Sequence, residues 1–205
     1  MKKENILKLA AKYLDNNILL PIGFSSCLIG TKCGWEGDDY SVDLVESIFN
    51  SQKVLRVHFC PENFSFGTPR EFSSIHGGTG EDVLDGKARV FTVTGKDWTE
   101  GALRAAHETL KVFKEKGAVM AIMTDTSPSC GSHVIYSGNP SDKNYLQGFG
   151  VTAALLQRNG IEIIAQRDTK TLSYLLQILD NKFEPDKNAI DYVESEWYTT
   201  YFKAK

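Results

Sequence analysis

The chain has 205 residues, of which 41% are hydrophobic and 24% are charged, and its formal net charge is −3. This composition is typical of a globular domain with a sizeable core. The slight acidity excludes a broad attraction to nucleic acid or to membrane surfaces, and no apolar run approaches the ~20 residues that a membrane-spanning helix needs.

The first residues are predicted to form an amphipathic helix over 2–16. Glu4, Lys8 and Asp15 interrupt its apolar positions, so the segment does not have the pattern of a secretory signal. We therefore expect a cytoplasmic protein. In such a protein the four cysteines are better explained as reactive or metal-binding thiols than as two disulfides.

Strand and helix patterns alternate along the rest of the chain. They predict a strand over 18–25, a helix over 41–52, a strand over 53–59, an irregular stretch over 61–97 with a short strand near 87–93, a helix over 98–116, a strand over 118–124, a helix over 149–159, a strand over 161–165, and helices over 169–180 and 187–202. This alternation predicts a mostly parallel sheet in an α/β, Rossmann-like three-layer fold, with additional N-terminal and C-terminal helices.

Cysteines follow three of the predicted strands. Cys27 and Cys60 come directly after two of them, and Cys130 comes a few residues after a third. If these strands are parallel neighbours, the three thiols meet at the carboxyl edge of the sheet, where open α/β sheets bind ligands. Three thiolates would hold a metal centre with one open position, which suggests chemistry. A small buried residue at a strand end is an equally good explanation of Cys27 alone, and Cys33 is better read as a loop residue.

Polar residues near these cysteines could take part in a reaction. Glu62 lies two residues after Cys60 and could transfer protons, although a solvated carboxylate is the commoner fate of a single glutamate. Ser127 and Ser129 belong to a Ser-Pro-Ser-Cys-Gly turn and could donate hydrogen bonds to sulfur or to a substrate. Arg70 could bind a carbonyl or an anion, or form an ion pair with Glu71 or another acid.

The motifs together resemble the 2-thiouracil desulfidase family. They occur in this order: Ser25–Gly30, Cys60-Pro61-Glu62, Thr68-Pro69-Arg70, the stretch 77–90, Ser127–Gly131 and the segment 148–156. The resemblance implies a desulfidase-like α/β domain over 18–166. Residues 1–17 would be a helical extension, and residues 167–205 would be helices that pack on the same domain.

The resemblance also implies a [4Fe–4S] cluster bound by Cys27, Cys60 and Cys130, whose fourth iron binds the sulfur of a thiocarbonyl substrate. The reaction would be the non-redox desulfuration of a thiolated pyrimidine, as a free base or nucleoside, to the oxo form plus sulfide. Within it Glu62, Ser127 and Ser129 would be catalytic, and Ser26, Trp35 and Arg70 would bind substrate. The loops around Trp35 and Asp125 depart from the family pattern, which leaves the substrate's identity open.

Two other functions are compatible with the residues. One is a metal-free enzyme in which Cys130 is the nucleophile. The other is a cluster-binding or zinc-binding sensor or interaction module without catalysis. A homo-oligomer is left open by the sequence.

Overall fold

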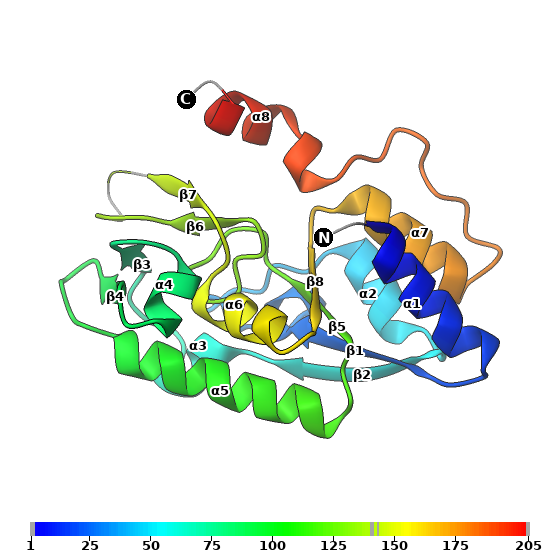
Figure 1. Ribbon diagram of the computed structural model, residues 1–205, viewed down its shortest axis with the longest axis horizontal. Coiled ribbons are helices and arrows are strands. Elements are labelled where there is room, and N and C mark those ends of the chain that lie inside the picture. The colour runs from blue at the N-terminus through cyan, green and yellow to red at the C-terminus, as the bar shows by residue number, and fades with distance from the viewer. Residues whose placement is uncertain (1–2, 140–141, 143, 204–205) are drawn as a thin grey trace.

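Four parallel strands form the central sheet of the computed structural model, which describes residues 3–139, 142 and 144–203. They are β1 (Leu20–Ser25), β2 (Val54–Phe59), β5 (Met120–Met123) and β8 (Glu162–Ala165), in the spatial order β2-β1-β5-β8 (Figure 1). Every residue of β1 is buried, as expected for a central parallel strand that is covered on both faces.

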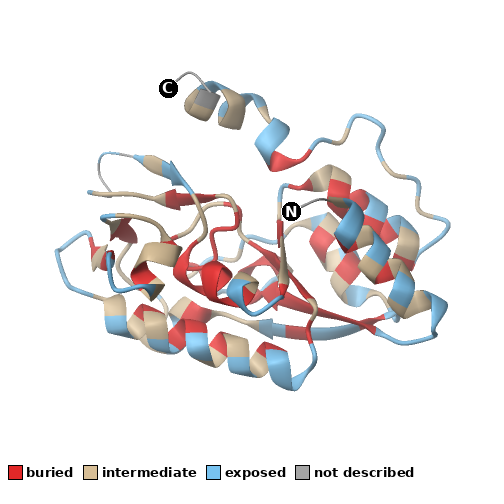
Figure 2. Ribbon diagram, viewed as in Figure 1, coloured by how far each residue is buried: buried red, intermediate tan, exposed pale blue. Residues whose placement is uncertain are grey.

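Helices cover both faces of this sheet (Figure 1). Side chains of α1 (Lys3–Asp15), α2 (Asp43–Asn50) and α7 (Thr169–Leu179) share one hydrophobic cluster with Met120 and Ile122 of β5. The alternate residues Ala121 and Met123 pack with α5 (Thr99–Glu115) and α6 (Val151–Arg158). Figure 2 shows the buried residues concentrated in the strands between these helices. The predicted α/β, Rossmann-like three-layer fold is confirmed.

The stretch 61–97 is more regular than the sequence pattern indicates. It contains α3 (Pro61–Phe66), α4 (Gly80–Leu84) and an antiparallel pair formed by β3 (Ser73–His76) and β4 (Arg89–Thr92). A second antiparallel pair joins β6 (Val134–Tyr136) to β7 (Tyr145–Gln147). β4 corresponds to the short strand predicted near 87–93, whereas the other elements are too short for hydrophobic periodicity to reveal.

The last helix is shorter than predicted. Instead of a helix over 187–202, the structure has a 3-10 turn, η3 (Tyr192–Glu194), followed by α8 (Glu196–Lys203). The carboxylate of Asp191 accepts hydrogen bonds from the backbone and hydroxyl of Thr171, each at 2.9 Å, which anchors the chain to α7 before the turn. The prediction of separate segments at 1–17 and 167–205 stays a prediction. In the part of the chain that the structure describes, no helix has the length and apolar character to cross a membrane.

Gly23 in β1 allows α5 to approach the sheet closely. A Cβ atom at this position would lie 2.2 Å from Cε2 of Phe113, a fully buried ring of α5. We expect Gly23→Ala to lower the free energy of unfolding by about 1–3 kcal/mol through overpacking, which urea denaturation would measure. The double variant Gly23→Ala/Phe113→Leu should recover part of this loss. A single variant as stable as the wild type would contradict the close packing.

Candidate active site

A cavity of about 430 Å³ lies at the carboxyl edge of the central sheet. From β1 the chain runs to β2 on one side, whereas β5 and β8 lie on the other side. The sheet order therefore reverses at β1, and open α/β sheets bind ligands at such a switch point. Residues at or after the carboxyl ends of all four strands line the cavity, including Ser25, Cys60, Thr124 and Gln166.

Cys27, Cys60 and Cys130 all line this cavity. Cys27 lies in a 3-10 turn, η1 (Ser26–Ile29), that follows β1 directly. Cys60 lies between β2 and α3, directly after the strand, and Cys130 lies in the loop after β5. Because β1 pairs in parallel with both β2 and β5, the three thiols come together from adjacent strands.

Cys33 is a fourth thiol at the same cavity, with only 2% of its surface exposed. Its interaction with the thiol of Cys27, together with burial, raises the pKa of Cys33 to about 12, although the thiol of Cys60 acts in the opposite direction. The structure confirms the prediction of a loop residue, but the sequence did not indicate that this thiol belongs to the site, because Cys33 follows no strand. Its spacing of six residues from Cys27, within a loop rich in glycine, is the signal that could have found it.

The remaining thiols are set in different surroundings. Cys60 Sγ accepts a hydrogen bond from the backbone N–H of Asn63 at 3.4 Å, at the start of α3. Its interaction with Cys33, followed by burial, raises the pKa of Cys60 above that of an ordinary thiol, and burial raises the pKa of Cys130 in the same direction. In the metal-free chain both are therefore protonated at neutral pH, and metal binding would displace their protons.

The loop that carries Cys130 is held from both sides. Ser127 Oγ accepts hydrogen bonds from the backbone N–H groups of Ser129 and Cys130, each at 3.1 Å. The first N–H groups of α6 donate to the carbonyls of the same loop, Val151 to Pro128 at 2.9 Å and Thr152 to Ser129 at 3.0 Å. These bonds satisfy the free donors at the helix start and fix the position of the Cys130 backbone.

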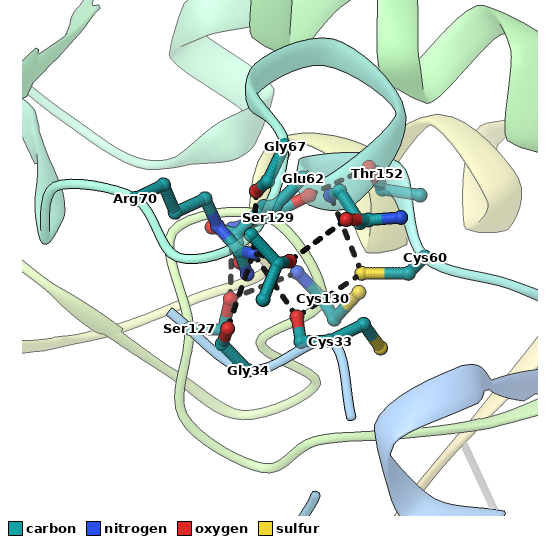
Figure 3. A network of polar contacts seen from close by, with 12 residues as sticks. Cys33, Gly34, Cys60, Glu62, Gly67, Arg70, Ser127, Ser129, Cys130 and Thr152 are labelled. Carbon is teal, nitrogen blue, oxygen red and sulfur yellow. Dashed lines mark hydrogen bonds and ion pairs between the residues drawn. The ribbon is translucent and has the colours of Figure 1, made fainter. Parts of the chain in front are cut away.

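The two serines of this loop face different surroundings. Ser127 lines the cavity. The hydroxyl of Ser129 forms a 2.9 Å hydrogen bond with that of Thr152 on α6, and Ser129 is absent from the cavity lining (Figure 3). The structure therefore brings Ser127 to the candidate site and leaves Ser129 outside it.

Arg70 forms an ion pair with Glu62 at 2.8 Å, and its guanidinium is nearly buried (Figure 3). The same group donates to the carbonyls of Cys33 at 3.0 Å and Gly67 at 3.2 Å, and to the hydroxyl of Thr68 at 3.1 Å. The donors of Arg70 are thus used within the protein. This arrangement corresponds to the ion pair with another acid that the sequence left open, and it orients the carboxylate of Glu62 at the cavity.

Trp35 and Ser26 also line the cavity. Trp35 is in edge-to-face contact with Phe72, which in turn contacts Tyr136, with ring centroids 5.5 and 4.7 Å apart. These three rings form an aromatic wall. The hydroxyl of Ser26 lies 3.1 Å from Nδ1 of His58 on β2, so it already has a partner within the protein.

The fold and the site together define an α/β protein with a thiol-lined cavity at its sheet edge. The family model described as 2-thiouracil desulfurase matches residues 22–168. The uncharacterized protein YbbK of Bacillus subtilis strain 168 is 41% identical over 145 residues, which are 70% of this chain and 94% of that protein. The chain therefore belongs to the 2-thiouracil desulfurase family and is an enzyme, as the sequence motifs predicted.

A solved structure agrees with this assignment. It is described as a [4Fe-4S]-dependent thiouracil desulfidase, TudS, and it is 28% identical to this chain. The two superpose with a TM-score of 0.60, over 71% of this chain and 90% of that chain.

The arrangement of the thiols can be compared with what different metal centres require. Among the described residues, no three His, Cys, Asp or Glu side chains are placed to hold one metal ion. This finding concerns a centre of a single ion, because a cluster has its protein ligands on different metal atoms. Three thiols at one cavity, with a backbone N–H group donating to Cys60 Sγ, fit the ligands and the hydrogen bonding of an iron–sulfur cluster.

Proposed function

We propose that this enzyme removes sulfur from a thiolated pyrimidine without a redox change. The carbon–sulfur double bond is replaced by a carbon–oxygen double bond, water supplies the oxygen and both protons, and hydrogen sulfide leaves. The observation that carries the proposal is the meeting of three strand-end thiols and the carboxylate of Glu62 at one cavity. The family and the description of TudS support it.

We further propose that Cys27, Cys60 and Cys130 bind a [4Fe–4S] cluster. Clusters of this kind usually have four thiolate ligands, so three protein ligands leave one iron open. When bound, the cluster would supply a soft Lewis acid that matches a substrate sulfur atom. Each proposed ligand follows a different strand of the sheet, whereas Cys33 lies in the loop after η1.

Glu62 is proposed to move the protons of the reaction. Its carboxylate would accept a proton from the attacking water and return it to the departing sulfide. Arg70 would act as a positioning residue, because its ion pair fixes one oxygen of Glu62 at 2.8 Å. Ser127 would orient the water or the substrate from the loop of Cys130.

The aromatic wall of Trp35, Phe72 and Tyr136 is evidence that the substrate is a flat ring. Edge-to-face contacts hold these rings against one another, and ligand sites that combine aromatic walls with a few polar groups suit small ring compounds. A pyrimidine ring could lie against this wall with its sulfur directed to the cysteines.

A metal-free mechanism with Cys130 as nucleophile is less well supported. Nucleophilic cysteines have a lowered pKa, because the thiolate is the reactive form. Burial shifts the pKa of Cys130 in the opposite direction.

The proposed function predicts conversion of 2-thiouracil to uracil by protein reconstituted with iron and sulfide. Anaerobic incubation followed by chromatography would measure it, with 2-thiouridine and thioacetamide as comparison substrates. We expect turnover of the pyrimidines and little turnover of thioacetamide, which has no ring to contact the aromatic wall. Failure to convert any thiolated pyrimidine would overturn the proposal.

A further inference from the structure

Three buried polar atoms at the cavity have no hydrogen-bond partner. They are Ser25 Oγ, Thr124 Oγ1 and Gln166 Oε1, which follow or end the adjacent strands β1, β5 and β8. Within the described residues, Glu162 Oε2 is also unpartnered, but Glu162 begins β8 and is not part of the cavity lining. Burying a polar group without a partner is costly, so a group of them at one cavity indicates a polar ligand.

The three atoms divide between two sides of the cavity. The Ser25 hydroxyl faces the thiol of Cys130, although it makes no hydrogen bond of normal geometry. Thr124 and Gln166 follow β5 and β8, whereas Cys27 and Cys60 follow β1 and β2 on the other half of the sheet. Met123 pairs with Ala165 in the sheet, so Thr124 and Gln166 are the next residues on neighbouring strands, about 5 Å apart along the sheet.

The Gln166 backbone is fixed by its own hydrogen bond. Its N–H group donates to the carbonyl of Met123 at 2.8 Å, which continues the β5–β8 pairing past the end of the strands. The Asp125 carboxylate also belongs to the cavity lining, but it is already paired with Arg167 and accepts from the Thr126 hydroxyl at 3.2 Å. Gln166 Oε1 and Thr124 Oγ1, in contrast, are buried here without a hydrogen-bond partner in the protein.

We propose that Gln166 and Thr124 recognise the N–H and C=O edge of the pyrimidine. This inference rests on the proposed function and deepens it. A side-chain amide has an acceptor and a donor next to each other, and the N–H–C=O edge of a uracil-type ring presents the complementary pair. A hydroxyl can donate or accept beside it. The ring would then have its sulfur on the thiol side of the cavity and its polar edge on the β5–β8 side.

Binding of uracil tests this edge recognition without any desulfuration, because the product has the same N–H and C=O edge. Calorimetry with the anaerobic, cluster-loaded protein would compare the wild type with Gln166→Leu. We expect uracil to bind about 10- to 100-fold more weakly to the variant, the usual range for leaving buried polar groups unpaired. Gln147→Leu is the matched control, since Gln147 is bonded to Tyr198 on the exposed surface and does not line the cavity.

A ligand whose N–H groups are methylated distinguishes loss of a hydrogen bond to these groups from a general change in the shape of the cavity. The wild type should prefer uracil to 1,3-dimethyluracil, and this preference should be lost in Gln166→Leu. Desulfuration kinetics should show a raised KM with a smaller change in kcat. Equal affinity of the wild type and Gln166→Leu for uracil, or no uracil binding by the wild type, would overturn the inference. A wild type that binds uracil but converts no thiolated pyrimidine would instead overturn the proposed function.

Discussion

Replacement of Cys60 by serine is expected to remove iron from the protein and to abolish desulfuration. Cys60 directly follows β2 and lines the cavity together with Cys27 and Cys130. A metal centre supplies several kcal/mol of transition-state stabilisation in comparable reactions. At ~1.4 kcal/mol per tenfold change in rate, its loss should lower kcat/KM by about 10³-fold or more. Cys27→Ser and Cys130→Ser should have the same effect.

Cys33→Ser is the matched control, because it removes a buried thiol from the same cavity without removing a proposed ligand. Iron analysis and the visible absorbance of protein reconstituted under anaerobic conditions would report the cluster. We expect Cys33→Ser to retain both signals. Retention of the full iron content and activity by Cys60→Ser would show that the ligands have been assigned incorrectly.

Replacement of Glu62 by glutamine is expected to lower kcat by about 10²- to 10⁴-fold, the usual contribution of a positioned proton-transfer group. Glutamine has nearly the same shape and can still accept a hydrogen bond from Arg70, which holds Glu62 at 2.8 Å. The thiols should keep their positions, so the iron content and visible absorbance should not change. The effect on activity would then arise from the lost carboxylate.

Glu36→Gln provides the comparison, since Glu36 is another carboxylate that lines the cavity. Steady-state kinetics over a range of pH would be measured for both variants. We expect Glu36→Gln to keep a kcat close to that of the wild type, and Glu62→Gln to show a lowered kcat across the measured range. Turnover by Glu62→Gln at the wild-type rate would remove Glu62 from the mechanism.

The sequence predicts the strands of the central sheet but not their order in space. Buried apolar runs and flanking turn residues predict all four strands of the central sheet, with differences of about two residues at their ends. Their spatial order depends on tertiary packing, in which Gly23 meets the ring of Phe113. The sequence predicts that the three thiols meet only if the strands that precede them are parallel neighbours. The order β2-β1-β5-β8 satisfies this condition.

The side chains of the candidate site were harder to predict than its location. Arg70 and Ser129 have partners far away in the sequence, the carbonyl of Cys33 and the hydroxyl of Thr152, and no local pattern reveals such contacts. Gln166 was missed for a similar reason. A single glutamine after a strand is unremarkable until the unpartnered Oε1 is found buried at the cavity.

If three strand-end cysteines hold an iron–sulfur cluster that this enzyme needs to remove sulfur from a thiolated pyrimidine, as proposed, desulfuration should depend on the cluster and on no redox partner. The most direct measurement is of the amounts of uracil and sulfide that form from 2-thiouracil. Metal-free and reconstituted protein would be compared under anaerobic conditions, with no added oxidant or reductant. We predict equal amounts of uracil and sulfide from the reconstituted protein and neither product from the metal-free protein. Uracil formation at the same rate by the metal-free protein would contradict the account.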